Sequence, residues 1–317
     1  MLAQVDVFQQ KHSFVGFPFA VIKKYGDDES GYQAALVTYY SFLSLFPLLI
    51  VAISVIDLVS QHNMELRHRL TDAIGNYFPS IGDQLRTSVH GSKASGITLV
   101  IGLLFTLYGS KGSADAIRHA LDHAWEVPRK DRPGFPKNTL KSLGLMVGGG
   151  LGLIISAFLS SYATATLGHS LWFRVVPIVL SLGITYLVFI FVYKIGTARK
   201  HVMSDIRLGA LMASVALLIL QTLGGVLVKH QLHNAHSANA QFAVVLVLLF
   251  WIYLQAQVFM YTVQLNVVHA LKLWPRSLTG KPLTKADQKA LTLYIKREKL
   301  QTPPEHVAVE FNDKAKA

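Results

Sequence analysis

Long uncharged hydrophobic runs alternate with charged segments along the chain. A helix needs roughly 17–25 apolar residues to cross the hydrocarbon core of a bilayer, and six runs free of Asp, Glu, Lys and Arg reach that length. Helices of soluble proteins keep a polar face toward water, whereas these runs have no charged face. Hydrocarbon is therefore the expected solvent. The predicted spans are approximately residues 34–57, 94–112, 142–163, 175–195, 207–228 and 242–266.

The composition supports this prediction and excludes several other classes. Hydrophobic residues make up 51% of the 317 positions and charged residues only 15%, against about 25% charged in soluble domains. Disorder requires the opposite balance. The chain has no cysteine, which excludes disulfides, cysteine-ligated metals and thiol catalysis. We therefore predict an all-α membrane protein, a six-helix bundle within residues 1–275.

The distribution of Lys and Arg predicts how the bundle is oriented. Six spans place both termini on one side, and that side carries 24 of the 30 Lys and Arg residues. Because positively charged loops stay in the cytoplasm, both termini are expected there, in a bacterial inner membrane. The basic excess is thus mainly a topology signal, and no nucleic-acid partner is expected.

Three segments outside the spans have patterns of their own. Residues 5–24 are aromatic and end in two lysines, which predicts an interfacial helix along the cytoplasmic leaflet, the alternative being a disordered tail. The outer loop 59–93 has apolar residues at helical spacing, which predicts an amphipathic helix. Residues 276–317 are expected to form a partly disordered cytoplasmic tail, with one short helix capped by Thr284 and Asp287.

Short motifs along the chain occur in an order typical of one family. The first span has small residues, a tyrosine pair and a serine-rich stretch ending in Phe-Pro-Leu, and the outer loop has an aromatic-Pro step. Span two is followed by Ala-Leu-x-x-x-Trp within residues 116–127, and span six ends in Gln-Leu-Asn. Over about residues 20–275 the chain resembles the YihY/BrkB family, bacterial inner-membrane proteins formerly labelled ribonuclease BN. The matching positions include Ala34, Ala35, Tyr39, Tyr40, Ser41, Ser44, Phe46, Pro47, Leu48, Phe78, Pro79, Trp251, Tyr253, Gln257, Gln264, Leu265 and Asn266.

The resemblance implies a six-helix inner-membrane protein that exports or flips lipids or lipid-like anions. One departure concerns the end of the sixth span. The family usually has Gly-Ala-Glu before Leu-Asn, and this chain has Thr262-Val263-Gln264. A mechanism that needs a titrating carboxylate at that position is therefore not expected here.

Polar residues inside spans are costly, so they are the first candidates for a substrate pathway. Gln257, Tyr261 and Gln264 are spaced i, i+4 and i+7, which places them on one helix face. The alternatives are hydrogen bonds between helices for the amides and a lipid-facing belt for the tyrosines. The predicted pathway residues are Tyr39, Tyr40, Ser44, Pro47, Gln257, Tyr261, Gln264 and Asn266.

Basic residues after the second span are candidates for contact with a lipid phosphate. Lys111, Arg118 and Arg129 are predicted to hold the headgroup at the cytoplasmic opening, the alternative for this stretch being ion pairs along a solvated helix face. His119 and His123 are spaced i, i+4 and are the weak candidates for a metal site. The pattern does not assure a third ligand or a general base, so neither a metal nor a catalytic residue is assigned.

These features favour a transporter or flippase of lipids or lipid-like anions, with membrane lipids as partners. A membrane scaffold or assembly factor without transport is the alternative, and a metal-dependent ribonuclease is the third hypothesis. Nucleotide-binding and hydrolase motifs such as Walker A, G-x-S-x-G or H-E-x-x-H do not occur in the chain. No cofactor and no enzymatic activity are therefore predicted.

Overall fold

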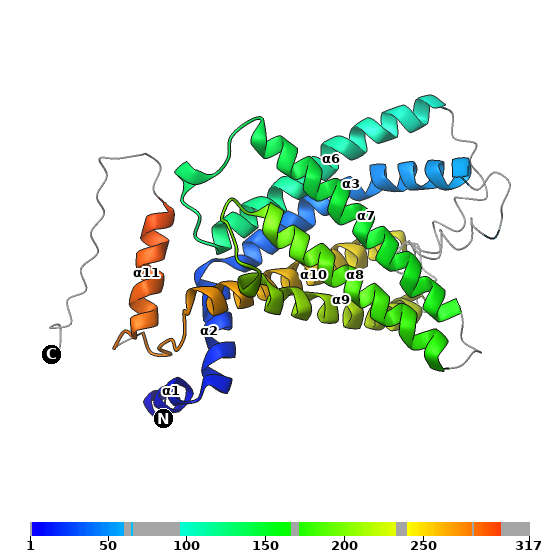
Figure 1. Cartoon of the computed structure of the whole chain (residues 1–317). Helices are drawn as coiled ribbons and strands as arrows, with labels where there is room; N and C mark the ends of the chain where they lie inside the picture. The colour runs from blue at the N-terminus through cyan, green and yellow to red at the C-terminus, as the bar shows by residue number, and fades with distance from the viewer. Residues whose placement is uncertain are drawn as a thin grey trace.

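The part of the protein that the structure describes is mainly helical. The computed structural model describes residues 2–59, 65, 96–165, 171–232, 240–280 and 282–298, and this part contains no strand (Figure 1). The amphipathic helix expected in the 59–93 loop, and the tail beyond residue 298, lie outside it. The helices are α1 (Leu2–Lys11), α2 (Ser13–Asp27), α3 (Ser30–Val59), α6 (Gly96–Ala124), α7 (Lys137–Ala165), α8 (Leu171–Gly196), α9 (Met203–Leu232), α10 (Ala240–Leu271) and α11 (Lys285–Arg297), with a 3₁₀ turn at Arg129–Asp131.

Four of these helices are long and apolar enough to cross a membrane. The segments that qualify are Lys137–Ser156, Val175–Gly196, Met203–Gly224 and Val245–Leu271, in α7 to α10. The first two expected spans lie largely in α3 and α6, helices of 30 and 29 residues. A protein with several such helices is a membrane protein, as predicted, whereas the number of six spans stays a prediction.

The long helices pack mainly as neighbours in the chain, α3 with α6, α7 with α8 and α9 with α10, while α10 also contacts α3 (Figure 1). Small residues set the closest approaches. A Cβ atom on Gly148 would lie 2.5 Å from the Phe191 ring, and one on Gly152 would lie 2.2 Å from Val188. These glycines therefore allow α7 and α8 to pack closely.

The N-terminal segment differs from the single interfacial helix that the sequence predicts. It contains two helices, because α1 ends at Lys11 and α2 starts at Ser13. The chain folds back at this point: a Cβ on Gly16 would lie 2.6 Å from the Gln9 carbonyl oxygen. One face of α2 is buried against α10, whereas Phe14 is 91% exposed. The buried face of α2 is thus packed against the bundle, while a position along the leaflet stays a prediction.

The described part of the C-terminal segment packs at the same end of the molecule (Figure 1). The predicted cap of α11 is confirmed, since Thr284 and Asp287 form a reciprocal capping box. Asp287 also accepts hydrogen bonds from Arg276 and from the backbone N–H of Ser277. Arg276 and Ser277 are buried, so the residues after 275 continue the packed structure up to α11.

Candidate functional site

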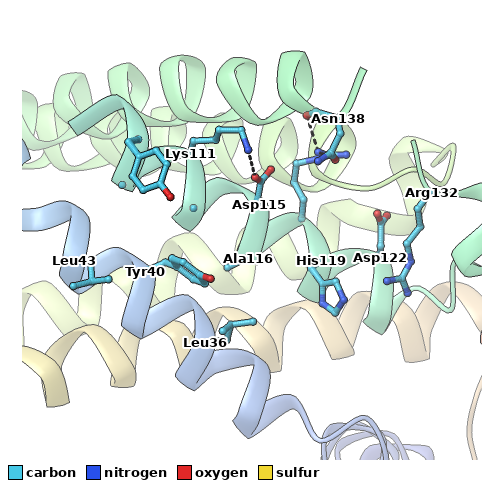
Figure 2. Close-up of a pocket in the computed structure, with 14 residues that line it drawn as sticks. Leu36, Tyr40, Leu43, Lys111, Asp115, Ala116, His119, Asp122, Arg132 and Asn138 are labelled. Atoms are coloured by element: carbon cyan, nitrogen blue, oxygen red, sulfur yellow. Dashed lines mark hydrogen bonds and ion pairs between the residues drawn. The ribbon is translucent and has the colours of Figure 1, made fainter. Parts of the chain in front are cut away.

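A groove of about 710 Å³ lies between α3 and α6 and is named here the α3–α6 groove (Figure 2). Its apolar wall comes from α3, and its polar wall comes from α6, the segment after α6 and the start of α7. Figure 2 shows Leu36, Tyr40 and Leu43 of α3 at the lower left, Lys111 and Asp115 above them, and Asp122 and Arg132 to the right. The residues that define it are Leu36, Tyr40 and Leu43 on one side, and Lys111, Asp115, Arg118, His119, Asp122, Arg132 and Asn138 on the other.

Helical spacing explains both walls. The three apolar residues of α3 are spaced i, i+4 and i+7, and the polar residues of α6 follow the same spacing over three turns. Each set therefore forms one stripe along its helix. The two helices approach closely at Gly112, where a Cβ would lie 2.7 Å from the Tyr40 ring. The glycine thus brings the stripes together and seats Tyr40 against α6.

The charged residues on the polar wall differ in the kind of partner they have. Lys111 forms an ion pair with Asp115 at 2.7 Å. Arg118 is only 2% exposed, and its Nη1 donates to the Asn138 carbonyl oxygen at 2.9 Å and to Ser142 Oγ at 3.1 Å. These partners of Arg118 are neutral, so they fix the guanidinium without neutralising it.

The remaining two charged residues of the groove are Asp122 and Arg132. Asp122 accepts hydrogen bonds from Thr197 Oγ1 at 3.0 Å and from the backbone N–H of Ala198 at 2.6 Å. Arg132 donates to the Val127 carbonyl oxygen through Nε and Nη2. Figure 2 shows the Arg132 and Asp122 side chains next to each other. The groove therefore holds three cations and two carboxylates.

The structure places the three predicted headgroup residues in two locations. Lys111 and Arg118 line the α3–α6 groove. Arg129 instead forms an exposed ion pair with Glu298 at 3.1 Å. Arg132 is the additional arginine of the groove. The sequence offered no signal to choose between Arg129 and Arg132, because both follow α6 in the same basic segment.

The polar residues of α10 share one face, as their spacing predicts, and that face meets α2. Tyr25 Oη donates to Gln257 Oε1, and the rings of Tyr25 and Tyr261 stack with centroids 4.0 Å apart. Gln264 Nε2 donates to Asp28 at 2.8 Å. These residues therefore hold α10 to α2, which corresponds to the alternative role of hydrogen bonding between helices. They do not line the α3–α6 groove.

The other predicted pathway residues are dispersed. Asn266 accepts a hydrogen bond from the Gly209 backbone N–H at 2.6 Å and joins α10 to α9. Tyr40 lies in the groove, whereas Tyr39 is 56% exposed. Pro47 belongs to α3, but its side chain lies outside the described residues. Ser44 lines a second cavity.

This second cavity, of about 370 Å³, lies among α3, α6, α7, α8, α9 and α10. Its lining is mostly apolar, with hydroxyls from Ser41, Ser44 and Ser113 and the amide of Gln255. Ser41 and Ser113 hydrogen-bond to each other at 2.8 Å and join α3 to α6. A cavity between the first and sixth expected spans is therefore present, although Gln255 lines it rather than Gln257.

A buried cluster of charges, named here the Lys24 cluster, lies where α2, α6, α10 and α11 meet. It comprises Lys24, Asp28, Glu126, Gln264 and Arg297. Lys24 is 0% exposed and contacts both carboxylates. Arg297 lies 3.2 Å from Asp28 and 3.2 Å from Glu126. No local pattern in the sequence predicts the cluster, because its members come from four separate segments.

Glu126 is unusual in both backbone and ionisation. Its φ of 56° lies in the left-handed region that ends α6, a conformation that costs a non-glycine residue about 1 kcal/mol. Burial raises the pKa of Glu126 to about 7, against the lowering effect of Lys24 and with a further raising effect of Asp28. The carboxyl group therefore changes its charge near neutral pH.

Metal ligands do not gather around the two candidate histidines. The His119 and His123 rings lie 6.4 Å apart between centroids. Within the described ranges, no group of three His, Cys, Asp or Glu side chains is placed to hold a metal ion.

Long apolar helices packed around glycine contacts, with an amphipathic groove between two of them, define an integral membrane protein of the helical-bundle class. Comparison with known families makes the assignment specific. The family described as Virulence factor BrkB matches residues 21–285, and the chain belongs to this family. The resemblance found from the sequence motifs is thereby confirmed.

An individual relative is also similar. An uncharacterized protein of Dickeya dadantii (strain 3937), Dda3937_02003, is 28% identical over 211 residues, which cover 60% of this chain and 64% of that protein. The chain thus spans slightly less than two thirds of this relative's length. No solved structure matches the chain.

Proposed function

We propose that the protein is a six-span transporter or flippase of the bacterial inner membrane, with both termini in the cytoplasm, which moves anionic lipids or lipid-like amphiphiles. The four membrane-spanning candidates and the two further long helices α3 and α6 support the number of spans. The excess of Lys and Arg at the terminal side supports the orientation.

The observation that carries the proposal is the two-sided α3–α6 groove. An anionic amphiphile presents a charged headgroup next to a hydrocarbon chain, and the groove presents a cationic wall opposite an apolar one. An arginine binds a phosphate oxygen pair with charge-assisted hydrogen bonds. Arg118 lines the groove and is held in position by neutral partners rather than by a direct ion pair.

The second cavity supports movement rather than static binding. It lies on the other side of the α3–α6 contact, since Tyr40 and Gly112 line the groove while their neighbours Ser41 and Ser113 line the cavity. An apolar cavity of about 150 Å³ is large enough for benzene, and this one holds about 370 Å³. We infer that the two sites are successive positions for an amphiphile.

Reconstitution tests the proposal directly. Purified protein is placed in liposomes with a fluorescent phosphatidylglycerol analogue, and lipid movement is followed by quenching from outside. Arg118→Gln should slow the movement by about tenfold or more, since a hydrogen bond to a charged group contributes about 1.5–3 kcal/mol. Lys111→Gln should also slow it, because it leaves Asp115 without its cation. Arg118→Lys, which keeps the charge, should retain more flux than Arg118→Gln.

The scaffold alternative predicts a different result. If the wild-type protein moves lipid no faster than protein-free liposomes, transport is excluded, and a partner recovered in fixed stoichiometry supports a scaffold. Thermal unfolding in detergent must show that each variant is folded, because Arg118 is buried and bonded to α7.

A further inference from the structure

We propose that the α3–α6 groove selects headgroups that carry one negative charge, such as a phosphodiester, over phosphomonoester dianions and over zwitterions. This inference rests on the proposed function and specifies its substrate class. It follows from counting the positive and negative charges on the polar wall of the groove, one pair at a time.

The first pair is neutral by itself. Lys111 and Asp115 lie one helical turn apart on α6 and form an ion pair at 2.7 Å. Asp115 is further fixed by Ser142, whose hydroxyl donates to its other oxygen. The carboxylate therefore has partners on both oxygens and compensates the charge of Lys111 in place.

The second pair, Asp122 and Arg132, also has no net charge, although its two charges lie slightly farther apart. Asp122 is held by two neutral donors, Thr197 Oγ1 and the Ala198 backbone N–H. Arg132 is held by a neutral acceptor, the Val127 carbonyl oxygen. Their side chains lie next to each other in Figure 2, and each charge acts on the other. Together they add no net charge to the groove.

Arg118 is the third cation of the groove: Asp122 and Asp115 both act on it at longer range, but neither forms a direct ion pair with it among the described residues. Its hydrogen-bond acceptors are Asn138 and Ser142, both uncharged. Its Nε is buried and has no hydrogen-bond partner among the described residues. An orphaned donor on a buried guanidinium costs free energy unless a ligand or water satisfies it. Arg118 lines the groove and thus combines the surplus positive charge of the polar wall with a donor that no described protein group satisfies.

The single surplus positive charge of the groove determines which lipid headgroup it prefers. A phosphodiester has a single negative charge and neutralises Arg118 on entering the groove. A phosphomonoester is largely a dianion above its second pKa of about 6, so it would bring one uncompensated charge into a poorly solvated site. A zwitterionic headgroup has no net charge and leaves that of Arg118 uncompensated.

Short-chain lipids of defined headgroup charge test this preference. Binding of dioctanoyl phosphatidylglycerol, phosphatidic acid and phosphatidylcholine to the purified protein is measured in detergent at about pH 8. His119 is neutral there, because burial and the neighbouring Arg132 hold its pKa below the ordinary histidine value. The wild-type protein should bind phosphatidylglycerol about tenfold more tightly than either other lipid, the effect of roughly one charge-assisted hydrogen bond.

Asp115→Asn gives the sharper test, because it predicts a gain. The substitution frees the charge of Lys111 and leaves two surplus cations, so affinity for phosphatidic acid should rise by about tenfold relative to phosphatidylglycerol. Loss of folding cannot produce such a reversal. Glu298→Gln is the matched control: it also removes one carboxylate, but from the exposed pair with Arg129 outside the groove, and the order of affinities should not change.

The outcomes separate this inference from the proposed function. If the lipids bind with equal affinity and Asp115→Asn does not change their order, the charge selection is wrong while lipid binding stands. If the wild-type protein binds none of the three and moves none of them in liposomes, the proposed function fails as well.

Discussion

The protein contains two groups of charged residues that have a similar composition but different roles. The Lys24 cluster combines two cations with two carboxylates and is closed, with Lys24 fully excluded from solvent. The α3–α6 groove combines three cations with two carboxylates and encloses a space of about 710 Å³. The role of such a group of charges therefore depends less on how many charges it has than on whether other charges of the protein compensate them.

The Lys24 cluster is best understood as a structural junction. Buried ion pairs add little net stability, because desolvation offsets their attraction, but removing one partner is costly. The cluster connects α2, the end of α6, α10 and α11 through Lys24, Glu126, Gln264 and Arg297. It thereby fixes how these elements meet, whereas the groove keeps one cation without a carboxylate partner.

The largest effect is expected from Lys24→Met. The substitution leaves Asp28 and Glu126 buried with Arg297 as their remaining cation, so the free energy of unfolding should fall by about 3–5 kcal/mol. Thermal unfolding of the purified protein in detergent measures the change. Lys200→Met, at an exposed lysine, serves as the control, and an equally stable Lys24→Met variant would show that the cluster is not a junction.

A smaller effect, with a defined pH window, is expected from Glu126. Because burial raises the folded-state pKa of Glu126 from 4.5 to about 7, the native state binds a proton that the unfolded state has lost in this range. Stability should therefore be highest below about pH 4.5 for this group, and about 1–3 kcal/mol should be lost as the pH rises to about 7.

Comparison of wild type with Glu126→Gln isolates this contribution. The difference in unfolding midpoint between the two proteins should change across the window from about pH 4.5 to 7, whereas Asp6 and Asp287 titrate elsewhere. Hydrogen bonds that favour the charged form lower the pKa of Asp6 and of Asp287 to about 2 despite burial. Their contribution is lost only as the pH falls below about 4. A pH-independent difference would contradict the assignment to Glu126.

The smallest effect is expected from Arg129→Gln. Arg129 and Glu298 are both exposed, and exposed ion pairs contribute at most about 1 kcal/mol. Stability should change by less than about 0.5 kcal/mol and lipid movement in liposomes should be unchanged. A loss of flux comparable to that of Arg118→Gln would place Arg129 in the substrate pathway. It would also contradict the distinction between the paired cation Arg129 and the unpaired cation Arg118.

Local patterns in the sequence were sufficient for several features. The apolar runs identified α7 to α10 as membrane helices because hydropathy depends only on consecutive residues. The spacing of Gln257, Tyr261 and Gln264 correctly placed them on one face, because helical periodicity is also local. The capping box of α11 followed from Thr284 and Asp287 for the same reason.

Only the tertiary structure decided which partner each polar face meets. The shared face of α10 meets α2 through Tyr25 and Asp28, and Lys24 pairs with Glu126, 102 positions away. Arg132 lies in the groove while Arg129, three residues earlier, does not. The amino-acid sequence therefore determined the solvent, the helices and the family of this protein. The packing of helices from distant segments determined which charges are compensated, because electrostatic pairing depends on distance in space rather than along the chain.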